Sequence, residues 1–102
     1  MFSHETEILR KMRFIEWLKA ELIANVGYLY QAMAKNSEQA IKEGLASLII
    51  LCYILARRLG ISFGELDEII MGKIGDNIRQ EHEAERLFGD FTACQRYLQQ
   101  RR

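Results

Sequence analysis

The sequence lacks proline altogether and has only two cysteines, one tryptophan and no excess of charge of either sign. Because proline interrupts helices, its absence allows helices to run unbroken over long stretches. Cys52 and Cys94 form no Cys-x-x-Cys pair and have no histidine at zinc-ligand spacing, so we expect no zinc site. The 14 basic and 14 acidic residues are balanced in each half of the chain, which argues against a basic surface for nucleic acid.

Features of exported and membrane-spanning proteins are missing as well. The N-terminus, Met-Phe-Ser-His-Glu, has no basic segment followed by an apolar one, as a signal peptide would. The longest nearly uninterrupted apolar run, residues 45–56, is shorter than the roughly 20 residues that cross a bilayer. We therefore expect a soluble, cytoplasmic protein with no membrane partner.

Apolar residues make up 49% of the chain and recur three and four positions apart, the spacing of an amphipathic helix. No alternating pattern of a strand competes with them. We predict an all-α fold, a single domain over residues 1–102, built as an antiparallel bundle of about four helices. The expected helices cover about residues 3–35, 37–59, 62–85 and 90 to near the C-terminus. Ser37 and Asp90 are the expected N-caps, and Gly60 is the expected C-cap.

Two of the expected helices carry apolar residues that need a partner. The first has a nearly regular heptad stripe of Ile8, Met12, Ile15, Leu22, Val26, Leu29 and Met33. The second is apolar on almost every face around residues 48–56, so it must be covered on several sides. Wet apolar side chains in that number would cost both stability and solubility. We therefore predict a homo-oligomer, a dimer or a tetramer, with the second helix at its centre.

Three stretches carry a resemblance to a known family. They are Trp-Leu-Lys-Ala-Glu-Leu-Ile-Ala at residues 17–24, Glu-Gly-Leu-Ala-Ser-Leu-Ile-Ile at residues 43–50, and Arg-Arg-Leu-Gly-Ile-Ser at residues 57–62. A later Lys-x-x-x-Asn is formed by Lys73 and Asn77. In this spacing the chain resembles the MazG-like family of all-α nucleoside triphosphate pyrophosphohydrolases, and most of all a short bacterial subgroup of it.

The resemblance implies a metal site that this chain has lost. Catalytic members hold Mg²⁺ on four carboxylates from Glu-x-x-Glu and Glu-x-x-Asp motifs, because this hard cation prefers oxygen ligands. The matching positions here are Glu21, Ala24, Gly44 and Ser47, so a single carboxylate is left. What the family likeness implies is therefore a non-catalytic scaffold without a cofactor, acting through self-association and binding a nucleotide or a protein.

Two other functions stay open from the sequence. One is a divergent, Mg²⁺-dependent nucleoside triphosphate pyrophosphohydrolase that uses Glu21 and Glu43. The other is a pure protein-interaction module whose partner covers the second helix or the acidic stretch at residues 81–85. Fold resemblance alone does not transfer activity.

The candidate site residues are polar side chains on helix faces. Glu21 with Asn25, and Glu43 with Ser47, are each four residues apart and could form one polar cluster that binds a cation or is simply hydrogen-bonded. Lys73 and Asn77 could contact a phosphate, as in the family pattern, or belong to a polar helix surface. His82 and Glu85 share a helix face and could be ligands, although a solvated charged surface is the more common role.

Overall fold

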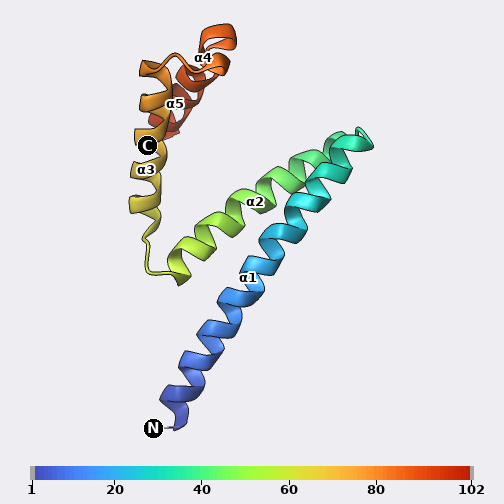
Figure 1. Ribbon diagram of the computed structural model, residues 1–102, viewed down its shortest axis with the longest axis vertical. Helices are drawn as coiled ribbons and strands as arrows, with labels where there is room; N and C mark the ends of the chain where they lie inside the picture. Colours follow the sequence, from blue (N-terminus) through green and yellow to red (C-terminus); the bar gives the residue numbers. More distant parts are fainter. Residues whose placement is uncertain (1, 102) are drawn as a thin grey trace. The chain divides into compact units, whose positions relative to one another are not determined.

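The computed structural model describes residues 2–101, with side chains from His4 onward, and it is all-α as predicted. Its five helices are α1 (Phe2–Ala34), α2 (Glu38–Arg58), α3 (Phe63–Arg79), α4 (Glu83–Phe88) and α5 (Asp90–Arg101) (Figure 1). No strand occurs in this described part of the chain. The helices fall into two compact units, Met1–Phe63 and Gly64–Arg102, which are described separately here. The prediction of a single domain stays a prediction.

The first unit is an antiparallel hairpin of α1 and α2 (Figure 1). The chain reverses direction at Asn36, whose φ of 53° lies in the left-handed region that asparagine tolerates. Backbone N–H groups of Asn36 and Ser37 donate to the carbonyls of Met33 and Ala32, each at 3.0 Å, and close the end of α1. Ser37 is the N-cap residue of α2, as predicted from its position in the sequence.

The two helices pack along an inward-facing seam. On α1 the seam consists of Ile15, Leu18, Leu22, Asn25, Leu29 and Ala32, all buried or half-buried, with Leu18 only 2% exposed. On α2 it consists of Ile41, Gly44, Leu48, Leu51 and Leu55, again all buried or half-buried. The backbone of Gly44 lies against Leu29, because a Cβ at Gly44 would stand 3.6 Å from the Leu29 Cα.

The apolar stripe predicted for the first helix divides between two faces of α1. Its members Ile15, Leu22 and Leu29 belong to the seam, whereas Met12, Val26 and Met33 are more than half exposed. The division has a geometric cause. A residue one position away from a seam residue points about 100° away from α2. The spacing of apolar residues in the sequence does not show which of them face α2 and which face outward.

The predicted end of α2 is confirmed at Gly60. Its φ of 88° lies in the left-handed region, and the N–H groups of Gly60 and Ile61 donate to the carbonyls of Arg57 and Ala56 at 3.1 and 2.9 Å. Phe63 then packs edge-on against Tyr53, with ring centroids 5.8 Å apart, and the Arg57 guanidinium lies over the Phe63 ring.

The second unit corrects the prediction of one long helix to about Glu85. Helix α3 ends at Arg79, because Glu81 adopts a φ of 51° that no helix can contain. His82 then caps a separate short helix, α4: its Nδ1 accepts a 3.0 Å hydrogen bond from the Ala84 N–H. Gly89, with φ 68°, ends α4.

Helix α2 is less covered by its own unit than the sequence suggests. Within it only Gly44 and Ala56 are buried, while Leu45, Ile49 and Ile50 are 48–60% exposed. Among the described residues, α2 is the one helix whose length and apolar composition would suffice to span a bilayer. The apolar run at residues 45–56 is too short to cross a bilayer, as expected, but the whole of α2, with 21 residues, is long enough. Core helices of soluble proteins also meet this criterion, so it does not decide the location.

Candidate functional site

The hairpin has two sides, which follow from helix geometry. Successive residues of an α-helix are 100° apart. Seen from one end of the hairpin, one of the two antiparallel helices turns clockwise along the chain and the other turns counter-clockwise. Residues one position before the seam residues therefore lie on the same side of the hairpin on both helices. Residues one position after them lie on the opposite side. We call these the motif side and the apolar side.

The motif side carries three of the four polar candidates of the hairpin. Its members are Phe14, Trp17, Glu21, Ala24 and Tyr28 of α1, and Glu43, Ser47, Ile50 and Ile54 of α2. Asn25 belongs to the seam. The apolar side carries Ile23, Val26, Tyr30 and Met33 of α1 and Leu45, Ile49, Cys52 and Ala56 of α2. By the same rule the charged residues Glu16, Lys19 and Lys42 lie at its two ends.

The α1 pair Glu21 and Asn25 is tied to its own helix. The Asn25 side-chain amide donates a 2.8 Å hydrogen bond to the Glu21 backbone carbonyl, and both residues are half-buried. This bond uses one amide hydrogen and leaves the Glu21 carboxylate to other partners or to water. The two residues are neighbours, as their spacing predicts.

The α2 pair lies at another level of the hairpin. Glu43 accepts a 3.3 Å hydrogen bond from the Gln39 side-chain amide, one turn earlier on the same helix. Because Gly44 lies against Leu29, Glu43 is level with about Tyr30, which is nine residues beyond Glu21. That offset is about 13 Å along the helix axis.

The two carboxylates therefore do not meet within one hairpin. Side chains lean toward the N-terminus of their own helix, so Glu21 and Glu43 lean away from each other. Ser47 is level with about Val26, which brings it close to the level of Asn25 and Ala24. Whether these residues bind anything stays a prediction.

Packing at Gly44 bears on the family's carboxylate positions. A Cβ there would stand 3.3 Å from Leu29 Cδ1 and 3.5 Å from Leu29 Cβ, so Leu29 would have to shift by a few tenths of an ångström to admit a side chain. Among the described residues, no group of three or more His, Cys, Asp or Glu side chains is placed to hold a metal ion. The hairpin thus offers one carboxylate, Glu21, where the family pattern has four.

Comparison with known proteins decides the family. The sequence model of the MazG-like family matches residues 8–91, which is most of the chain. The chain belongs to the MazG-like family. No curated protein and no solved structure matches it.

The phosphate candidates of this MazG-like chain lie on α3, in the second unit. The Asn77 side-chain amide donates a 2.8 Å hydrogen bond to the Lys73 carbonyl, the same one-turn contact that Asn25 makes on α1. The Lys73 ammonium is exposed and has no ion-pair partner among the described residues. Their contact with a phosphate stays a prediction.

In this MazG-like chain His82 and Glu85 have structural partners. Glu85 accepts hydrogen bonds from the Thr92 backbone N–H at 2.8 Å and from the Thr92 hydroxyl at 2.7 Å, and thereby caps the start of α5. His82 stacks edge-on against Phe91 at 5.1 Å between centroids. Asp90 is the N-cap predicted from the sequence, but the structure gives this role to Glu85. Gly89, with its left-handed φ, lets the chain fold back so that a residue of the preceding helix reaches Thr92.

Proposed function

We propose that this MazG-like protein is a cytoplasmic, self-associating scaffold without pyrophosphohydrolase activity. The observation that carries the proposal is the survival of one carboxylate, Glu21, at the four positions where the family pattern holds its cation. Mg²⁺ needs near-octahedral oxygen coordination and is held by carboxylates together with substrate phosphates. With a single carboxylate the ion would be bound mostly by water, so neither the nucleophile nor the leaving phosphate would be activated.

Packing supports the view that the lost carboxylate at Gly44 is not easily restored. A glutamate stem at this position would begin in tight contact with the Leu29 side chain, which would have to shift. The glycine allows α1 and α2 to approach closely at this point, so a carboxylate there would compete with the contact that holds the hairpin together. The loss of the site and the packing of the hairpin therefore agree.

The apolar side of the hairpin supports self-association. Ile23, Val26 and Tyr30 of α1 and Ile49 of α2 are 53–74% exposed, and no residue of their own unit covers them. On α1 the apolar residues of this side run from Ile23 to Met33, about 15 Å along the helix axis. A second hairpin has the length to cover the whole side, and the product is a four-helix bundle.

The charges beside α2 favour this covering over a lipid bilayer. Lys19 and Glu21 of α1 are level with about Ile54 and Cys52, in the C-terminal half of α2, and would be carried toward the hydrocarbon with it. Each charged residue near the bilayer centre costs roughly 2.5–3.5 kcal/mol. The Lys19–Glu16 ion pair, at 2.7 Å, is also typical of a surface in water. The choice of a bundle in water over a bilayer rests on this balance.

An assay of pyrophosphate release tests the loss of activity. Wild-type protein is incubated with each of the common NTPs and dNTPs in Mg²⁺ or Mn²⁺, and we expect no release above background. Release that Glu21→Ala abolishes would overturn the proposal and establish the divergent hydrolase. The double variant Ala24→Glu with Ser47→Asp is the matched comparison, because it adds two carboxylates near Glu21 on the motif side and leaves Gly44 untouched.

A thermal-shift screen with the same cations gives an independent measure. Ligands that bind only the folded state raise the melting temperature in proportion to RT ln(1 + [L]/Kd). We expect no shift from Mg²⁺ or Mn²⁺ with wild-type protein and a positive shift with the double variant. Light scattering during gel filtration then gives the mass: a dimer or tetramer agrees with the scaffold, and a well-folded monomer contradicts it.

A further inference from the structure

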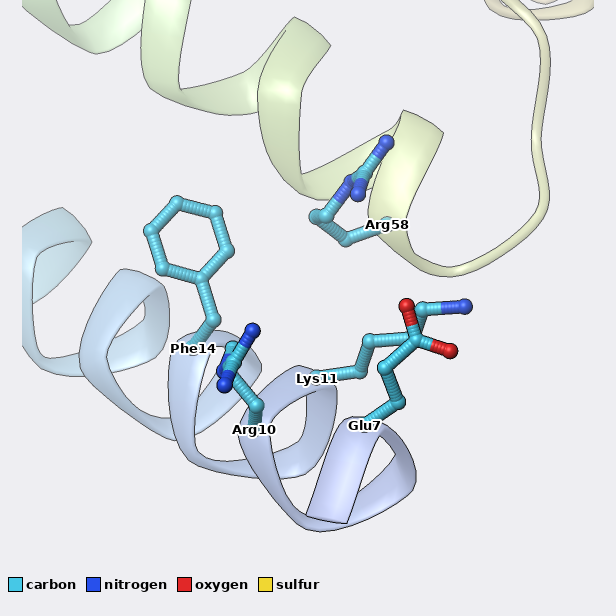
Figure 2. Close-up of a pocket in the computed structure, with 5 residues that line it drawn as sticks. All are labelled: Glu7, Arg10, Lys11, Phe14 and Arg58. Atoms are coloured by element: carbon cyan, nitrogen blue, oxygen red, sulfur yellow. The ribbon is translucent and has the colours of Figure 1, made fainter. Parts of the chain in front are cut away.

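A pocket of about 300 Å³ lies within the first unit, where the C-terminal end of α2 stands over the N-terminal half of α1 (Figure 2). It is lined by Glu7, Arg10, Lys11 and Phe14 from α1 and by Arg58 from α2. In Figure 2 the α1 side chains rise toward α2, and the Arg58 side chain lies across the last turns of its own helix, with its guanidinium on the side away from α1. The volume is at the small end of the range for ligand pockets, which is about 300–1,000 Å³.

The charge of this pocket is one-sided. Arg10, Lys11 and Arg58 bring three positive charges, against the single negative charge of Glu7. None of the four forms an ion pair with any residue in the part of the chain that the structure describes. The whole protein has no net charge, so this local excess of two positive charges is a property of the pocket rather than of the chain.

The end of α2 does little to neutralise that excess. A helix C-terminus carries partial negative charge on its free carbonyls. Here the carbonyls of Leu55, Ala56 and Arg57 already accept hydrogen bonds from the N–H groups of Leu59, Ile61 and Gly60 at 2.9–3.1 Å. An anion near Arg58 therefore meets capped carbonyls instead of free ones.

From this geometry we infer a polyphosphate-binding site that uses no divalent cation. Guanidinium groups bind phosphate through paired hydrogen bonds, and lysine adds a mobile point charge. Two arginines and a lysine line one small pocket and bring positive charge of the kind that a bound metal supplies in other phosphate sites. Phe14, stacked on Trp17 at 5.6 Å between centroids, forms an apolar wall beside the cations. The ligand class is a phosphate chain, either inorganic or carried by an organic group that contacts this wall.

The site is separate from the family's carboxylate positions. Arg10 precedes Glu21 by eleven residues, about 16 Å along α1. Binding here therefore depends neither on the absent metal site nor on self-association through the apolar side. Loss of binding at this pocket can therefore be measured separately from pyrophosphohydrolase activity and from self-association.

Titration calorimetry with inorganic triphosphate in EDTA and low salt tests the site. We expect saturable binding of one triphosphate per chain, weakening as NaCl is raised. Arg10→Gln and Arg58→Gln should each weaken it about tenfold, because hydrogen bonds between charged groups are the strong ones. Glu7→Gln should strengthen binding, because it removes the one opposing charge. All of these side chains are exposed, and circular dichroism checks that each variant keeps its helices.

Arg13→Gln is the matched control, because it removes the same charge from the next turn of α1 without lining this pocket. We expect it to bind triphosphate like the wild type. An equal loss in Arg13→Gln, or no saturable binding by the wild type, would overturn the site. A comparison arm uses ATP in EDTA: equal affinity for ATP and triphosphate identifies a pure phosphate site. Tighter ATP binding that Phe14→Ala removes identifies an organic phosphate.

Discussion

Two glycines inside the hairpin have opposite surroundings. A Cβ at Gly27 would have no heavy atom within 4 Å, whereas at Gly44 it would stand 3.3 Å from Leu29 Cδ1. Glycine inside a helix costs about 1 kcal/mol relative to alanine. Close packing against a neighbouring helix can offset this cost only where there is no room for a larger side chain. At this scale Gly44 is a packing residue and Gly27 is not.

Valine at these two positions should therefore act in opposite ways. Gly44→Val overpacks the seam against Leu29 and should lower the free energy of unfolding by about 1–3 kcal/mol. Gly27→Val should leave it unchanged or raise it by up to about 0.5 kcal/mol, because valine is the better helix former. Thermal melts followed by circular dichroism at equal protein concentration measure both. Equal melting temperatures for the two variants would contradict the packing at Gly44.

Between elements, the junction of α4 and α5 is held by side-chain caps. Helix α4 has six residues, too few to be stable alone, so its ends depend on His82 and Gly89. The Glu85 carboxylate connects it to α5 by accepting both donors of Thr92. A carboxylate at a helix N-terminus also interacts favourably with the helix dipole.

Glu85→Ala should loosen the start of α5. Loss of a charged cap costs about 1–2 kcal/mol, so exchange of the Thr92 amide hydrogen should speed up about tenfold. Hydrogen exchange followed by NMR measures that amide directly. Arg86→Ala, on the neighbouring exposed residue, is the control and should leave the Thr92 rate unchanged. If the two variants exchange alike, Glu85 is not the cap.

For the whole molecule, the decisive surface is the apolar side of the hairpin. Ile49 and Ile50 are neighbours in sequence and nearly equally exposed, at 58% and 60%, yet they lie on opposite sides. Ile49 belongs to the apolar side, where a second copy is proposed to bind. Ile50 belongs to the motif side, together with Glu21 and Ser47.

Ile49→Glu should dissociate the oligomer, and Ile50→Glu should not. A carboxylate in the centre of an apolar interface would be desolvated without a partner, which costs several kcal/mol and weakens association more than a hundredfold. Light scattering across a dilution series gives the mass of each variant. Dissociation by both variants would show that the interface is not confined to the apolar side.

The predicted helices and their breaks followed from local chemistry, and most of them are confirmed. Ser37 stands at the predicted N-cap position, although its side chain makes no capping hydrogen bond, and the left-handed φ of Gly60 depends on glycine itself. The long third helix was wrong for a different reason. Glutamate rarely adopts a positive φ, so the sequence does not predict a helix break at Glu81. The break is stabilised by the cap that His82 provides and by the contact of His82 with Phe91.

The candidate site shows the same division. The loss of three family carboxylates can be read directly from residues 24, 44 and 47, because alanine, glycine and serine carry no carboxylate in any fold. The separation of Glu21 from Glu43 could not be read in this way. Both pairs have the correct spacing along their own helices, and only the contact of Gly44 with Leu29 sets the level at which the helices meet.

By itself, the sequence determined the all-α class and the family, since both depend on residue identity and on spacing along a single helix. The tertiary structure decided which apolar residues face the partner helix, which face outward, and that Arg58 joins Arg10 and Lys11 around one pocket. These relations depend on the rotation and level of one helix against another. The contact of Gly44 with Leu29 marks the level at which α1 and α2 meet, and this level cannot be read from the sequence of either helix alone.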